Sequence, residues 1–176
     1  MADRDPQIGK QVRPTADTDF AAWIHGQVAA LREGRFFDLD IDDLTDEVES
    51  LAKRDFRKLQ SALRVILQHM LKWDYQRERR GESWRRSIND ARDRVWGELA
   101  SSPSFCPRVP EAIDQAYPVA RSKAWAETGV FVLDRGLKTC PYSWDEIMFR
   151  AHELDPDQVP KDENDPFQGD ISSEDD

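Results

Sequence analysis

The sequence predicts an all-α fold: an antiparallel four-helix bundle-like domain, followed by a short C-terminal helix and a disordered acidic tail. Apolar residues recur every three or four positions in four long segments, which is the period of a helix with one buried face. Charged residues make up 34% of the chain, above the roughly 25% of typical globular domains, as expected when each helix solvates its remaining faces. Short connections between such helices favour antiparallel packing.

Two helices are expected in the first half of the chain. The first should begin near Asp17 or Thr18, which are both good N-caps, and should stop at Gly34. The second covers residues 42–73, where one five-residue step interrupts the three-and-four spacing of the apolar stripe. Because no Gly or Pro lies in this segment, one continuous helix is predicted rather than two.

Two further long helices are expected over residues 83–100 and 108–128. Ser83 is the predicted N-cap of the first of these. Pro118 lies inside the second and should kink it, because proline removes one backbone hydrogen bond. Gly129 is the predicted stop.

The last part of the predicted domain contains two short signals. The apolar run Val130–Leu133 has some strand character but no obvious partner strand. The sequence Ser-Trp-Asp-Glu at residues 143–146 is a capping box and predicts the start of a last short helix.

The predicted organisation is a flexible arm over residues 1–14, a single helical domain over 15–154 and a disordered acidic tail over 155–176. The tail has nine acidic residues and one lysine, so most of the net charge of −10 belongs to it. Few apolar residues and three prolines favour disorder there. A positive patch on the helical domain therefore remains compatible with the acidic total.

The composition also indicates where the protein works. No segment approaches the roughly 20 apolar residues that span a bilayer, and the N-terminus lacks the apolar core of a signal peptide. Cys106 and Cys140 are the only cysteines, too few for a disulfide framework. The sequence therefore predicts a soluble, cytoplasmic protein with reduced thiols and no membrane partner.

The most distinctive stretch is the basic-aromatic segment, residues 72–94. Arginine binds phosphate or carboxylate with two hydrogen bonds, and aromatic faces stack on bases or guanidinium groups. The candidate binding surface in this segment comprises Trp73, Tyr75, Arg77, Arg79, Arg80, Trp84, Arg85 and Arg86. In the structural alternative, which we favour, the two tryptophans pin the corner between two helices and the arginines pair with neighbouring acids.

No catalytic, cofactor-binding or metal-binding residue is predicted. Five acids between residues 38 and 49 fit positions 1, 3, 5, 9 and 12 of a calcium loop, but Asp43 stands where the loop needs glycine. Capping of the following helix is the favoured role for these acids. The three histidines are isolated, and Cys140 has no evident histidine partner.

Several blocks of residues occur in a recognisable order. They include Thr18-Asp-Phe-Ala-Ala-Trp23, His69-Met-Leu-Lys-Trp73, Glu127-Thr-Gly129 and Cys140-Pro-Tyr142. Over residues 17–148 the chain resembles the family catalogued as Domain of Unknown Function 29. The resemblance implies a bacterial, helical protein with no established reaction or cofactor, so no functional residue is carried over from it.

Three functions from different classes remain open at this point. The favoured hypothesis is a non-catalytic protein-interaction module with a protein partner of unknown identity. The first alternative is nucleic-acid or anion binding through residues 72–94, and the second is an enzyme whose site is not recognisable from sequence. The oligomeric state is not predicted.

Overall fold

The computed structural model describes residues 14–154, except for the side chains of residues 134 and 135. Nearly all of the predicted arm and the whole of the predicted acidic tail lie outside the described residues. All regular structure in the described part is helical, which confirms the all-α prediction. The chain divides into two compact units, Met1–Arg54 and Asp55–Asp176. The single domain expected over residues 15–154 stays a prediction.

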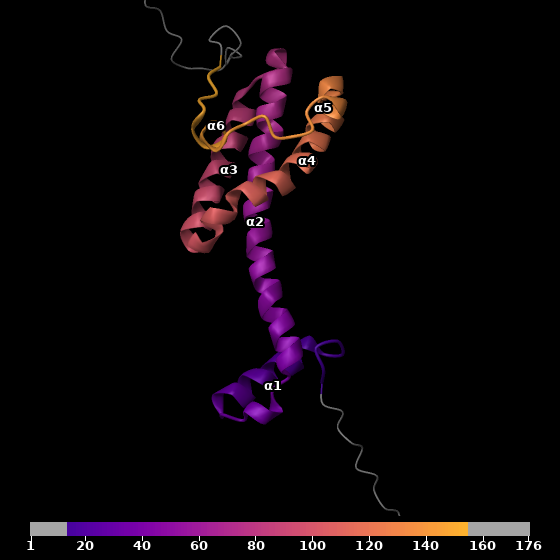
Figure 1. The fold of residues 1–176 in the computed structure, drawn as a ribbon, viewed down its shortest axis with the longest axis vertical. Coiled ribbons are helices and arrows are strands. Elements are labelled where there is room, and N and C mark those ends of the chain that lie inside the picture. Colours follow the sequence, from indigo (N-terminus) through magenta and orange to yellow (C-terminus); the bar gives the residue numbers. More distant parts are fainter. Residues whose placement is uncertain (1–13, 155–176) are drawn as a thin grey trace, which may run out of the picture. The chain divides into compact units, whose positions relative to one another are not determined.

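The N-terminal unit is built from α1 (Phe20–Arg32), the short 3-10 helix η1 (Phe36–Asp38) and the beginning of α2 (Ile41–Tyr75) (Figure 1). The side chain of Asp19 caps α1 by accepting a hydrogen bond of 3.0 Å from the backbone N–H of Ala22. The helix therefore begins just after the predicted position. Gly34 has a φ of 70° and lies just past the end of α1, as predicted.

The start of α2 is fixed by local polar contacts. Asp40 accepts a hydrogen bond of 3.3 Å from the backbone N–H of Asp43, and its own backbone N–H donates to the Gln27 side chain at 2.8 Å. The acids near residue 40 thus include a helix cap, as the favoured interpretation proposed. The helix continues without interruption to Tyr75, confirming one long helix rather than two.

The C-terminal unit has one apolar core. It is formed mainly by the later part of α2, by α3 (Glu82–Ser101) and by α4 (Val109–Thr128), with the short 3-10 helices η2 (Arg77–Arg79) and η3 (Pro103–Arg108) between them (Figure 1). The short helices α5 (Phe131–Arg135) and α6 (Trp144–Phe149) each contribute buried side chains, such as Leu133 and Ile147. The largest fully buried side chains are Tyr117, Leu59, Leu63, Ile66, Leu67, Met70, Leu71, Ile88, Leu133, Ile147 and Val95.

One local prediction, the cap of α3, is wrong, and the run with some strand character belongs to a helix. Ser83 does not cap α3, because the backbone N–H groups of Trp84 and Arg85 already reach the carbonyl of Gly81, which makes Gly81 the cap residue. The run 130–133 is not a strand. The N–H of Leu133 donates to the carbonyl of Val130, which starts α5, and no strand for it to pair with exists among the described residues.

The remaining helix-end predictions hold. α6 begins with the predicted capping box, in which Ser143 and Glu146 exchange hydrogen bonds. α4 runs through Pro118 without a break, and the kink there stays a prediction. None of the described helices combines the length and apolar character needed to cross a membrane.

Replacing Gly129 with alanine should destabilise the C-terminal unit by about 1 kcal/mol. Gly129 ends α4 with a φ of 68°, a left-handed conformation that costs a side-chain-bearing residue roughly this much. Urea unfolding measures the loss. The same substitution at Gly97, inside α3 with no atom near the added Cβ, should instead preserve or raise stability.

Candidate functional site

The basic-aromatic segment forms the corner between α2 and α3. Trp73 is 3% exposed and belongs to the last turns of α2. Arg80, five residues after the end of that helix, folds back so that its Nε donates to the Trp73 carbonyl at 2.8 Å. Its guanidinium carbon lies 5.3 Å from the centre of the Trp73 ring. Arg80 therefore satisfies a free carbonyl at the negative end of α2, where a cation is favourable.

Trp84 joins the same corner from α3. The ammonium group of Lys72 lies over the Trp84 ring, 4.5 Å from its centre, and also pairs with Glu127 of α4 at 2.7 Å. Three helices are tied together here by one lysine, whose side chain is only 10% exposed. His69 lies near the same ring, and burial followed by the charge of Lys72 lowers its pKa.

The other predicted surface residues face solvent. Arg77, Arg79 and Arg86 are exposed, and their side chains make no hydrogen bond or ion pair within the described residues. Arg85 pairs with Glu82 of its own helix at 2.7 Å, and Tyr75 is 37% exposed. The eight predicted residues thus divide into two sets. Trp73, which is buried, and the half-buried Arg80 and Trp84 form the corner, and the other five are exposed.

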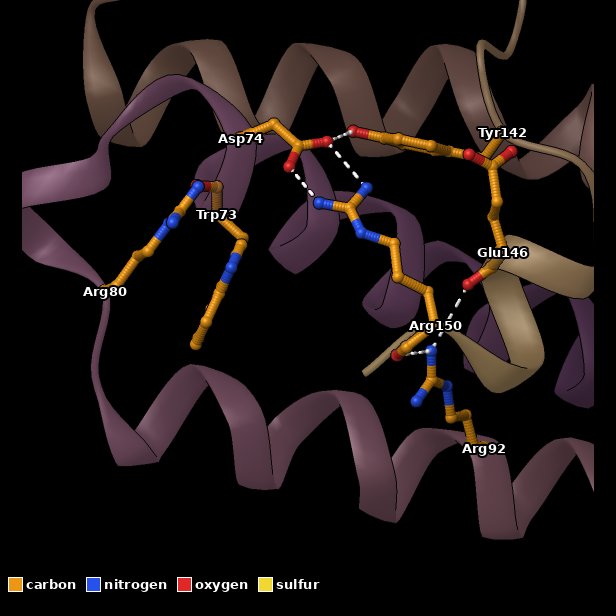
Figure 2. Close-up of polar contacts among 7 residues, drawn as sticks. All are labelled: Trp73, Asp74, Arg80, Arg92, Tyr142, Glu146 and Arg150. Carbon is orange, nitrogen blue, oxygen red and sulfur yellow. Dashed lines mark hydrogen bonds and ion pairs between the residues drawn. The ribbon is translucent and has the colours of Figure 1, made fainter. Parts of the chain in front are cut away.

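A polar cluster that sequence reasoning missed lies beside this corner (Figure 2). Asp74 accepts hydrogen bonds from both terminal nitrogens of Arg150, one at 3.0 Å, and a third from the Tyr142 hydroxyl at 2.8 Å. The aspartate and arginine side chains are 24% and 30% exposed. Burial alone would raise the pKa of Asp74, but the hydrogen bonds from Arg150 and Tyr142 outweigh it and hold that pKa below its ordinary value.

Arg92 of α3 completes the attachment of α6. Its Nε donates to the carbonyl of Ile147 at 2.8 Å, and one terminal nitrogen donates to the carbonyls of Glu146 and Arg150 at 3.3 and 2.9 Å. These carbonyls belong to the C-terminal end of α6, which has no further turn to satisfy them (Figure 2). Arg92 therefore caps α6 from a neighbouring helix.

His152 lies just beyond this attachment and is 6% exposed. Both of its ring nitrogens are buried and have no hydrogen-bond partner among residues 14–154. The ring meets Trp73 edge to face, with 5.1 Å between the ring centres. Burial, and then the positive charges of Arg92 and Arg150, lower the pKa of His152 to about 4. His152 is therefore a neutral, apolar-like part of the packing at neutral pH.

The chemistry of the cluster is that of a clamp. Burial raises the pKa of the Cys140 thiol, and the pKa of the Tyr142 hydroxyl is also raised, so neither group is activated as a nucleophile at neutral pH. Within residues 14–154 no three His, Cys, Asp or Glu side chains are placed to hold a metal ion. What the arrangement does is hold residues 142–152 against the end of α2 and the middle of α3.

Each of the two units also presents apolar side chains that are not part of this clamp. On the C-terminal unit a hollow of about 360 Å³, here the aromatic groove, is lined by Trp96, Leu99, Cys106, Val109, Pro110 and Trp144. On the N-terminal unit a larger set of exposed side chains forms what we call the N-terminal apolar surface. Its members are Phe20, Leu31, Phe36, Phe37, Ile41, Val48 and Leu51, which are between 46% and 107% exposed.

The described residues therefore define a helical protein whose clustered polar groups hold helices together, with apolar surfaces left open. The model of the family described as Domain of unknown function DUF29 matches residues 16–152. The chain belongs to this family, as the sequence blocks predicted. No curated protein and no solved structure matches the chain.

Proposed function

We propose that this chain is a non-catalytic protein-interaction module that binds its partner through the N-terminal apolar surface. The observation that carries the proposal is the burial pattern of the N-terminal unit. Trp23 and Ala30 are the only buried residues among those described there, whereas seven large apolar side chains are exposed. Large apolar side chains exposed in this number support an interaction site, because soluble proteins expose few of them together without a binding role.

The polar clusters support the same proposal. A reactive site gathers groups with perturbed pKa values around an open pocket. Here the buried polar groups of the C-terminal unit are instead consumed in joining helices, as Asp74 is by Arg150 and Tyr142. The clamp supports a rigid scaffold, and the exposed apolar residues supply the binding energy.

The proposal is tested by purifying the tagged full-length chain from the cells that produce it. The matched variant replaces Phe36 and Phe37 with aspartate, which leaves the fold intact because both rings are 65% or more exposed. We expect the wild-type chain to elute in a stoichiometric complex, with another protein or with itself, and the variant to elute alone. A wild-type chain that elutes alone, or a variant that retains the complex, contradicts the proposal.

Nucleic-acid binding is retained as a second candidate because Arg77, Arg79 and Arg86 are exposed without partners in the described part of the chain. Arginines without protein partners are available to phosphates. Replacing all three with alanine should leave urea unfolding unchanged, since no hydrogen bond or ion pair with another described residue is lost. The wild type should bind a single-stranded oligonucleotide, and the triple variant should bind it more weakly. The slope of the logarithm of affinity against the logarithm of salt concentration should become shallower by about two. Arg57→Ala, an exposed arginine of α2 outside the segment, is the control.

A further inference from the structure

The corner between α2 and α3 carries a positive surface. We call Arg77, Arg79 and Arg86 the arginine surface, because all three are exposed and make no hydrogen bond or ion pair within the described residues. Residues 77–86 contain five arginines and only two glutamates, and one of these glutamates is already paired with Arg85. This stretch therefore keeps a net positive charge, which favours an anionic occupant.

The most acidic part of the chain begins close to this surface. His152 packs against Trp73 at the end of α2, with 5.1 Å between the ring centres. The guanidinium carbon of Arg80 lies 5.3 Å from the centre of the same Trp73 ring (Figure 2), and Arg80 directly follows Arg79 in the chain. The arginine surface thus borders the corner that His152 fills. Only two residues separate His152 from residue 155, where the acidic tail starts.

The acidic tail, residues 155–176, has the complementary charge and sufficient length. It contains nine acids and one lysine, a net charge of −8. Its 22 residues can span up to roughly 70 Å, far more than the separation between neighbouring parts of one corner. Because the tail and the arginine surface belong to one chain, its carboxylates are present at an effective concentration of roughly millimolar. A separate anion does not have this advantage.

We propose that the acidic tail docks on the arginine surface of its own chain and competes there with other polyanions. Arginine and carboxylate pair through charge-assisted hydrogen bonds. Exposed ion pairs are individually weak and are screened by salt, so the docking is reversible. The inference goes beyond the interaction module, because it needs neither the N-terminal apolar surface nor a second protein. A nucleic acid must displace the tail before it reaches Arg77, Arg79 and Arg86.

Chemical cross-linking of the full chain tests the docking. Arg77, Arg79 and Arg86 are replaced together with lysine, which keeps each positive charge and supplies an amine. A carbodiimide joins these amines to carboxylates in direct contact, and mass spectrometry of the digested chain identifies the joined positions. We expect positions 77, 79 and 86 to be joined to carboxylates of residues 155–176. An isotope-labelled chain mixed with an unlabelled one distinguishes the two cases, and we expect pairs within one chain.

Arg57→Lys gives the matched control. Arg57 is exposed and lies sixteen residues, roughly 24 Å, before Trp73 along α2. We expect roughly tenfold less coupling of the tail to position 57 than to the arginine surface. Coupling at the arginine surface should be lost at about 1 M salt, where charges are screened beyond roughly 3 Å. Equal coupling at position 57, no coupling at the arginine surface, or coupling mainly between different chains overturns the inference.

Neutralising the acidic tail tests the competition. The variant changes the nine acids of residues 155–176 to the corresponding amides, which keeps the length of the chain. With a single-stranded oligonucleotide as the probe, we expect this variant to bind roughly tenfold more tightly than the wild type at low salt. The gain should vanish when Arg77, Arg79 and Arg86 are also replaced with alanine. Equal affinity of the variant and the wild type, or a gain that survives the alanine replacements, overturns the competition.

Discussion

Replacing Asp74 with alanine should lower the free energy of unfolding of the C-terminal unit by about 2–3 kcal/mol. The substitution leaves the Arg150 guanidinium and the Tyr142 hydroxyl without their shared acceptor in a half-buried site. Removing one partner of a buried ion pair costs about 3–5 kcal/mol. Because both side chains are roughly a quarter exposed, water replaces part of the lost contact and the smaller figure is expected.

The effect should appear first at α6. Asp74 lies at the end of α2, whereas Arg150 follows α6, so the lost contact is one that holds residues 142–152 in place. Urea unfolding at pH 7 measures the overall loss, and amide hydrogen exchange should show α6 opening before α2–α4. Asp74→Asn keeps the shape and one acceptor oxygen, so it should lose about half as much.

An exposed aspartate gives the matched control. Asp90 lies on the surface of α3, and Asp90→Ala should change stability by no more than about 0.5 kcal/mol. If Asp74→Ala and Asp90→Ala unfold at the same urea concentration, the cluster does not act as a clamp.

The helices could be predicted from the sequence because each produces a local pattern of residues. The repeat of apolar residues located α2 and α4 to within two residues, and the Ser143–Glu146 capping box marked the start of α6. The errors were also local. Gly81 took the capping role expected of Ser83 because a backbone carbonyl serves the first turn of α3 without any side chain.

The clamp formed by Asp74, Tyr142 and Arg150 could not be predicted from local patterns of this kind. Asp74 and Arg150 are 76 positions apart, and nothing in the spacing of either residue shows that α6 packs beside the end of α2. The block Cys140-Pro-Tyr142 drew attention to Tyr142, but its partner Asp74 is one charged residue among the 34% of the chain that is charged. Long-range pairs of common residues become visible only once the helices have been placed.

The exposure of the apolar surfaces could not be predicted from the sequence for a related reason. A stripe such as Ile41–Leu51 has the same spacing whether it is covered by its own chain or left open. Only the burial of each side chain, such as 64% exposure for Val48 against 0% for Leu63, separates the two cases. The sequence therefore predicts amphipathic helices, and the structure distinguishes which apolar faces are filled.

Lowering the pH from 7 to 4 should cost the C-terminal unit about 2–3 kcal/mol through His152 alone. Its pKa is about 4 in the folded chain, where burial and the charges of Arg92 and Arg150 oppose protonation, against an ordinary value of 6.5. Between these two pH values the unfolded chain binds the extra proton and the folded chain does not. Stability is therefore complete above pH 6.5 and falls as the pH drops through this window.

Phenylalanine at position 152 should remove this pH dependence. The ring keeps its edge-to-face contact with Trp73 and no longer buries two nitrogens that lack partners among the described residues, so stability at pH 7 should change by less than about 1 kcal/mol. Urea unfolding between pH 7.5 and 4.5 compares the two proteins. His69 retains a weaker slope of the same sign, because burial also lowers its pKa.

Asp74 acts in a separate pH range, which keeps the two groups distinguishable. Its pKa lies below the ordinary 3.8, so the stability that it contributes is present above that value and is lost only as the pH falls further. A loss of stability between pH 6.5 and 4 that persists unchanged in His152→Phe would therefore belong to neither residue. That result would show that His152 is protonated in the folded chain and that its contacts with Arg92, Arg150 and Trp73 are looser than the structure places them.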